Sequence, residues 1–90
     1  MSTLLLHATA GRAALTAWMD RSGVGVCELA RLLNRSHVAV SKWRSGHYRP
    51  SEVERAKLQR LSSGEVAALL WLTDAERAEI DAMQPHSAAA

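Results

Sequence analysis

The sequence predicts an all-α fold, a compact bundle of five or six short helices. Leu and Ala, both strong helix formers, dominate a chain that is 48% hydrophobic and contains no Phe. Apolar residues recur at helical spacing in successive short segments. Ser, Thr, Asn and Gly stand between these segments, where helices ordinarily begin and end.

The length and the cysteine content indicate the number of domains and the cellular compartment. The chain has 90 residues, enough for one small domain, which we expect over residues 5–83, with a flexible tail over residues 84–90. A single cysteine, Cys27, excludes an internal disulfide and favours the cytoplasm of a bacterium or of a phage-infected host. We expect Cys27 itself to be a small core residue. No apolar run approaches the ~20 residues of a membrane span, so no membrane partner is expected.

The first helix is predicted from about Thr9 to Arg21. Gly23 follows it and accepts the left-handed conformation that commonly ends a helix. Three apolar residues recur along this segment at helical spacing, namely Leu15, Trp18 and Met19.

A second helix is predicted over residues 26–33, with Gly25 at its N-cap. Asn34 tolerates the left-handed conformation better than most residues, so it can end this helix sharply. Four apolar residues form one stripe along the helix, namely Val26, Leu29, Ala30 and Leu33.

A third helix is predicted over residues 37–45, between the N-cap Ser36 and the terminating Gly46. Val40 and Trp43 share one face, so we assign Trp43 to the core and not to base stacking. The opposite face is short and mostly polar, with His37, Val38, Ser41, Lys42 and Ser45.

Two capping boxes predict helices in the second half of the chain. Ser51 with Glu54 opens a fourth helix to about Leu61, and Thr73 with Glu76 opens a last helix to about Met83. A further helical segment is expected between them, over residues 65–72.

Residues 66–72 are apolar on nearly every side of that expected helix. So small a domain can hardly bury all of them, so we expect the C-terminal helices, residues 64–83, to form a self-complementary dimer interface. Ordinary core packing is the alternative. The candidate interface residues are Val66, Leu69, Leu70 and Trp71.

The net charge of +2 conceals an uneven distribution. Residues 31–60 carry eight Lys and Arg against two Glu, whereas residues 61–90 carry one Arg against five acids. A basic segment that coincides with one compact motif favours a polyanionic partner. The alternative is an ordinary solvated surface.

Two short helices joined by a three-residue turn, over residues 26–45, meet the requirements of a helix-turn-helix. The stretch GVGVCELARLLNRSHVAVSKWRSGHYRPS resembles the Cro/CI-type (lambda-repressor-like, XRE-type) helix-turn-helix of phage and bacterial regulators. The family commonly has Ser or Thr at the position of Gly25, Gln at that of Val26 and Gly at that of Asn34. The residues that carry the resemblance are Glu28, Leu29, Ala30, Leu33, Ser36, Val40, Ser41, Trp43, Gly46 and Pro50.

The resemblance implies a domain of five helices that binds operator DNA as a homodimer without a cofactor. On this basis four residues are expected to contact bases, namely His37, Val38, Ser41 and Lys42. Six flanking residues are expected to contact phosphates, namely Arg35, Ser36, Arg44, His47, Tyr48 and Arg49.

We therefore expect a sequence-specific regulator of transcription that binds double-stranded DNA, most simply a repressor, with activation left open. The alternative is a protein-interaction or antitoxin-type module on the same scaffold. Enzymatic activity, a metal site and a small-molecule ligand are not expected. No cluster of His, Cys, Asp and Glu has metal-ligand spacing, no Gly-rich phosphate loop is present, and no nucleophile has an adjacent base.

Overall fold

The computed structural model describes residues 9–83, and every regular element in that range is helical. The all-α prediction is therefore confirmed; the tail predicted over residues 84–90 and the start of the domain at residues 5–8 lie outside the described range. None of the described helices is both long and apolar enough to cross a membrane. The elements are α1 (Ala10–Ser22), α2 (Val26–Leu33), α3 (His37–Ser45), α4 (Glu52–Leu61), the 3-10 helix η1 (Ala68–Trp71) and α5 (Asp74–Ala82).

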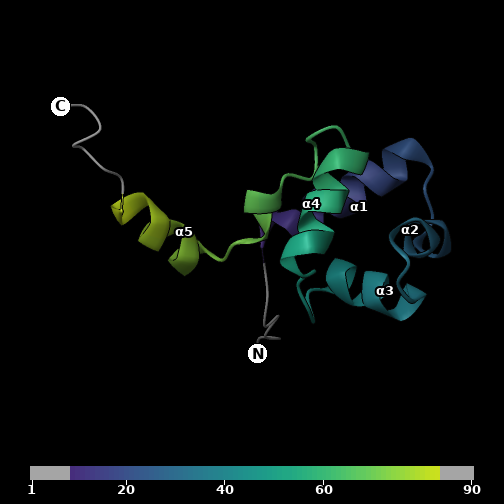
Figure 1. The fold of residues 1–90 in the computed structure, drawn as a ribbon, viewed down its shortest axis with the longest axis horizontal. Coiled ribbons are helices and arrows are strands. Elements are labelled where there is room, and N and C mark those ends of the chain that lie inside the picture. Colours follow the sequence, from purple (N-terminus) through teal and green to yellow (C-terminus); the bar gives the residue numbers. More distant parts are fainter. Residues whose placement is uncertain (1–8, 84–90) are drawn as a thin grey trace.

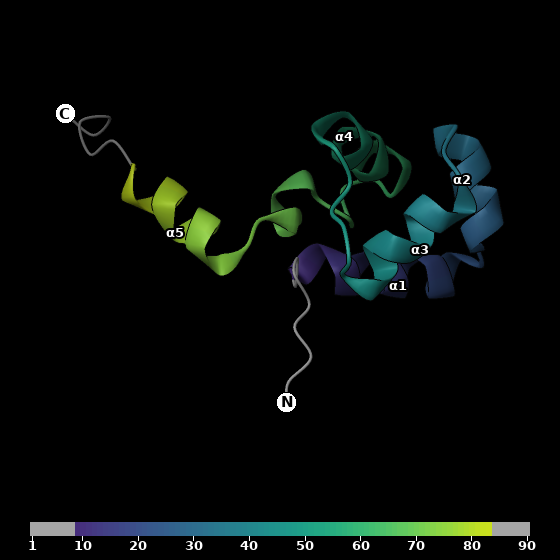
Figure 2. The same cartoon turned by 90° about the horizontal axis from the view of Figure 1, so that it is seen from below.

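One compact body contains α1 to α4 and η1, while α5 is set apart from it (Figures 1 and 2). Within the body, α3 packs against both α1 and α2, and η1 packs against α1 and α4. The three tryptophans all lie in the core, as expected for Trp18 and Trp43. The core residues are Leu15, Trp18, Met19, Leu29, Ala30, Leu33, Val40, Trp43, Leu58, Val66 and Trp71.

Local signals set the ends of α2 and α3, whose observed bounds match the prediction. Asn34 ends α2 in the left-handed conformation, with φ of 57°. The Ser36 hydroxyl accepts a hydrogen bond from the Ala39 N–H and so caps α3. Both predicted capping boxes, at Ser51 and Thr73, are also present.

The segment predicted as a helix over residues 65–72 is not an α-helix. Residues 62–66 form turns, and the remainder of the segment contains only the short 3-10 helix η1. Both Val66 and Trp71 are fully buried. Positions five residues apart, such as Val66 and Trp71, are separated by about 140° around an α-helix, so an α-helix cannot direct both side chains into one core. The Ser62 hydroxyl stabilises the turn, because it donates to the Leu58 carbonyl and accepts from the Val66 N–H.

Cys27 was expected in the core, but it is exposed near the start of α2. The buried side of α2 consists of Leu29, Ala30 and Leu33. Cys27 lies about 100° from Val26 around the helix, outside that stripe, so it projects into solvent.

Gly11 allows Trp71 to pack directly on the backbone of α1. A Cβ atom at position 11 would lie 2.7 Å from Cε2 and 2.8 Å from Cε3 of the Trp71 ring. Glycine is therefore the residue that permits this close approach of η1 to α1, which accounts for the burial of Trp71.

Arg49 connects the first turn of α5 to the body. Its Nη1 donates to the Trp71 carbonyl at 3.2 Å and to Oε1 of Glu76 at 2.6 Å. The same Glu76 oxygen accepts the Thr73 N–H at 2.9 Å. The Arg49 hydrogen bond, followed by that from Thr73, lowers the pKa of Glu76 from 4.5 to about 2.

We expect Gly11→Ala to destabilise the fold by about 1–3 kcal/mol, because the added methyl group overlaps the Trp71 ring. In a Trp71→Leu background the same change should be neutral or stabilising, since alanine is the better helix former. Chemical denaturation of the four proteins of this double-mutant cycle measures the difference. Equal costs of Gly11→Ala in both backgrounds would refute the steric explanation.

We expect the attachment of α5 to weaken as the pH falls from about 4.5 towards 2. The pKa of Glu76 is lower in the folded protein than in the unfolded chain, so its stabilising contribution is complete above pH 4.5 and is lost as the carboxylate is protonated. The NMR shift of the Thr73 amide should follow this titration. Glu76→Gln should abolish the transition, whereas a wild-type midpoint near 4.5 would contradict the pairing with Arg49.

Candidate nucleic-acid interface

The N-terminal half of α3 presents an exposed face of short side chains. His37, Val38 and Ser41 are exposed there, in agreement with the prediction that this face is free. Val40 and Trp43 are buried on the opposite side and fix the rotation of α3 about its axis. The four predicted base-contacting residues therefore lie on one face of α3. Three of them are exposed, and Lys42 is partly covered.

Lys42 is only half-exposed because its side chain lies over the ring of Tyr48. Its Nζ is 5.2 Å from the ring centroid, within the range of a cation–π contact. The Tyr48 N–H donates to the Lys42 carbonyl at 3.3 Å, which holds the loop after α3 close to the helix. Lys42 and the exposed Tyr48 thus form one unit at the edge of the α3 face.

An open groove runs between α1 and α3 beside this face. Arg12 and Arg44 contribute its cationic groups, and Thr16, Ser41 and Ser45 contribute hydroxyls. Arg44 is oriented by α1, because its Nε donates to Thr16 Oγ1 at 3.5 Å and its Nη2 lies 4.0 Å from Asp20 Oδ1. The Asp20 carboxylate also lines the groove, so a phosphate bound by the two guanidinium groups and the hydroxyls would replace Asp20 beside Arg44.

Arg12 was not predicted as a site residue. It lies on α1, outside the basic segment 31–60, and only the packing of α1 against α3 brings it beside Arg44. No local signal in the sequence of α1 identifies it.

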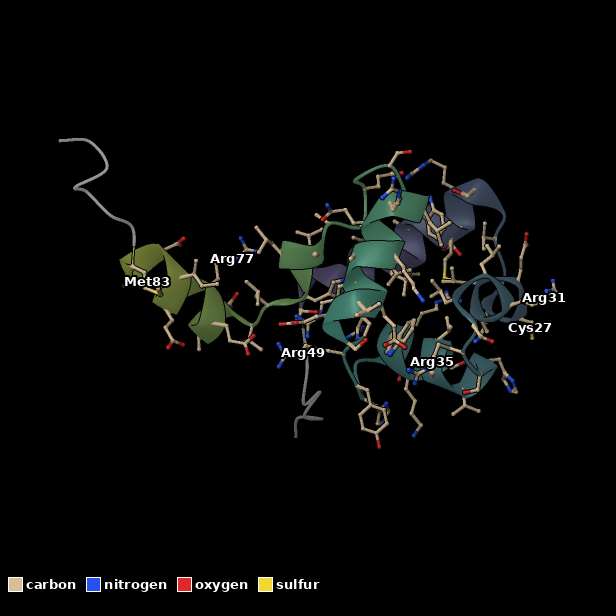
Figure 3. All side chains as sticks on the ribbon, in the orientation of Figure 1. Cys27, Arg31, Arg35, Arg49, Arg77 and Met83 are labelled. Atoms are coloured by element: carbon tan, nitrogen blue, oxygen red, sulfur yellow. The ribbon has the colours of Figure 1, made fainter. Side chains whose placement is uncertain are left out.

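Arg35 pairs with Glu54, a buried carboxylate in the first turn of α4. The side chain of Glu54 is 8% exposed, and its other oxygen accepts the Ser51 N–H at 2.8 Å. Burial of an unpaired carboxylate is costly, so this ion pair joins Arg35, in the turn between α2 and α3 (Figure 3), to the first turn of α4.

The six predicted phosphate-contacting residues therefore have different surroundings. Arg35 and Arg49 are engaged in ion pairs within the protein, and the Ser36 hydroxyl caps α3. Arg44 lines the groove, while His47 and Tyr48 are exposed in the loop that follows α3. Oγ of Ser45 lies 2.7 Å from Nδ1 of His47.

The predicted dimer face requires a correction. Val66 and Trp71 are buried in the core of the single chain, so they are not available to a second copy. The close approach of Trp71 to Gly11 is the physical reason for the burial of Trp71. Leu69 is 63% exposed and Leu70 is half-exposed, so only these two of the four residues remain at the surface.

Within residues 9–83, no three His, Cys, Asp or Glu side chains are grouped so that they could hold a metal ion. The features that distinguish this surface are instead cationic groups, hydroxyls and short exposed side chains.

We expect Arg35→Ala to destabilise the protein by about 1–3 kcal/mol, because it leaves the buried Glu54 carboxylate without its cation. Arg31→Ala is the matched control, since Arg31 is exposed on α2, and it should change stability by no more than about 0.5 kcal/mol. Urea denaturation of both variants tests this difference. Equal stabilities would show that the Arg35–Glu54 pair contributes nothing.

Comparisons with known protein families, curated proteins and solved structures found no match to this chain.

Proposed function

We propose that this protein binds double-stranded DNA in a sequence-specific manner and regulates transcription, with α2 and α3 as a helix-turn-helix. The observation that carries the proposal is the exposed, short-chained face of α3 beside the groove lined by Arg12 and Arg44. One surface thus combines a helix able to contact bases with cations able to contact the DNA backbone.

The α3 face has the size and the chemistry that a major groove about 12 Å wide admits. His37 and Lys42 can donate to the acceptors N7 and O6 of guanine, and Val38 can contact the methyl group of thymine. Ser41 can act as donor or acceptor with several bases. The burial of Val40 and Trp43 supports this arrangement, because it holds these four residues on the outer face.

Phosphate contacts follow from the groups around α3. Arg12 and Arg44 would bind one backbone segment in the groove between α1 and α3, and His47 and Tyr48 would contact another beyond the C-terminal end of α3. Such contacts orient the protein and make its affinity fall steeply with salt concentration.

The mechanism that we propose is steric repression by a homodimer. Two copies of α3 would enter successive major grooves, about 34 Å apart, on a palindromic operator. A dimer bound there would exclude RNA polymerase from an overlapping promoter. The resemblance of residues 23–51 to the Cro/CI-type regulators supports this role as an analogy only.

Selection from a random DNA library at low salt, followed by footprinting, tests the proposal. We expect enrichment of a palindromic site and a footprint of two half-sites. An absence of enrichment would contradict DNA binding and would favour the protein-interaction module instead.

We expect Lys42→Ala to change the base preference. Arg44→Ala should weaken binding to all sequences alike and reduce the slope of log affinity against log salt concentration by about 1. The reason is that a base contact distinguishes sequences, whereas a phosphate contact does not. Binding titrations on the selected site and on its single-base variants measure both effects. The Arg31 side chain points away from α3 (Figure 3), so Arg31→Ala serves as the control for loss of one positive charge. A changed preference in Arg44→Ala alone would overturn the assignment of the two residues.

A further inference from the structure

An exposed stripe runs along the outer side of α4. Its ends are Val53, which is 63% exposed, and Leu61, which is 42% exposed. Ala56, Lys57 and Arg60 complete it at the spacing of one helix face. This face points away from Glu54 and Leu58, which are buried. Neither Lys57 nor Arg60 has an ion-pair partner within residues 9–83.

The helix α5 has the complementary character. None of its residues is buried, and Ile80 and Met83 at its distal end are 48% and 73% exposed. Glu79 and Asp81 lie on either side of Ile80 and, in the described part of the chain, have no cation within ion-pair distance. From Asp74 to Ala82 the helix contains four acids and one Arg.

The acids near the C-terminal end of α5 are unfavourable within the isolated helix. The last turn contains no basic residue, and carboxylates at a helix C-terminus oppose the helix dipole. A local preference that is violated on an exposed helix is typical of a surface that serves another contact. A cationic surface from outside the helix would compensate for these charges.

We propose that α5 of one protomer packs along the α4 stripe of a second copy, and that the exchange is reciprocal. The dimensions agree, because α5 is about 13 Å long and the stripe from Val53 to Leu61 is about 12 Å long. Ile80 and Met83, about 4.5 Å apart along the helix axis, would cover the apolar surface at Leu61, while Glu79 and Asp81 would face Lys57 and Arg60. One chain carries both halves of this contact, so a two-fold arrangement satisfies it twice.

The α4 stripe of the same chain is not accessible to α5. Only Leu72 and Thr73 connect η1 to α5, and Arg49 holds the first turn through Glu76. Both views show α5 directed away from the body (Figures 1 and 2). This inference rests on the homodimer of the proposed function and specifies its interface, and the contacts between α4 and α5 do not involve DNA.

Complementary charge reversals in the full chain test the proposal. One variant is Lys57→Glu with Arg60→Glu, and the other is Glu79→Lys with Asp81→Lys. The second variant places cations at the C-terminal end of α5, which favours the helix, so a loss of association cannot be attributed to melting of α5. Circular dichroism checks that both variants are folded.

Sedimentation equilibrium without DNA provides the measurement. We expect the wild type to reach twice the 9.8-kDa mass of one chain, and each variant alone to associate at least about tenfold more weakly, because its like charges then oppose each other. An equimolar mixture should recover the dimer, since both contacts of a mixed pair again join opposite charges. Arg31→Glu, a reversal on α2, should leave association unchanged.

The inference is wrong if the wild type is monomeric at ~100 µM, a concentration well above a micromolar dissociation constant. It is also wrong if the folded variants dimerise like the wild type, or if their mixture stays monomeric. If the wild type is monomeric and the α4 reversal abolishes DNA binding, the stripe contacts DNA instead. A monomer that selects a DNA sequence refutes this inference alone, whereas a dimer of the expected kind that selects none refutes DNA binding alone.

Discussion

The carboxylate of Glu54 joins two parts of the chain that are separate in sequence, the start of α4 and the turn between α2 and α3. One oxygen accepts the Ser51 N–H and closes the start of α4, and the other pairs with Arg35 in the turn between α2 and α3. Because a buried carboxylate is costly without partners, both contacts must be kept in the folded protein. The loop from Gly46 to Pro50 is thereby closed between two fixed points, and α3 is held in one orientation relative to α4.

The orientation of α3 determines what its surface can do. Val40 and Trp43 face the core and Ser36 caps the first turn, so the exposed side of the helix consists of short side chains. The groove beside it depends on the packing of α1 against α3, which brings Arg12 and Arg44 together. The proposed DNA-binding surface is therefore a product of α1 and α3 together, and α3 alone does not form it.

The cations of the basic segment divide into structural and available groups. Arg35 and Arg49 form ion pairs within the protein, and Arg55 donates to the Pro50 carbonyl. Arg44 lies in the groove beside α1, 4.0 Å from Asp20, and Lys42 lies over Tyr48, whereas Lys57 and Arg60 lie on α4. The charge count of residues 31–60 therefore overstates the number of cations near α3, and it leaves a second basic surface to explain. The acidic α5 supplies a partner of suitable charge for that surface.

The ends of α2 and α3 and the starts of α4 and α5 are set by local contacts, and the sequence by itself determined them. The bounds of α2 and α3 follow from Gly25, Asn34, Ser36 and Gly46, and the capping boxes follow from residues three apart, because each contact lies within one turn of helix. Tertiary packing decided the rest. The burial of Trp71 depends on a glycine sixty residues earlier, the roles of Arg35 and Arg49 depend on distant carboxylates, and the place of Arg12 depends on the crossing of two helices. These contacts join residues far apart in the chain, so no spacing within the sequence indicates them.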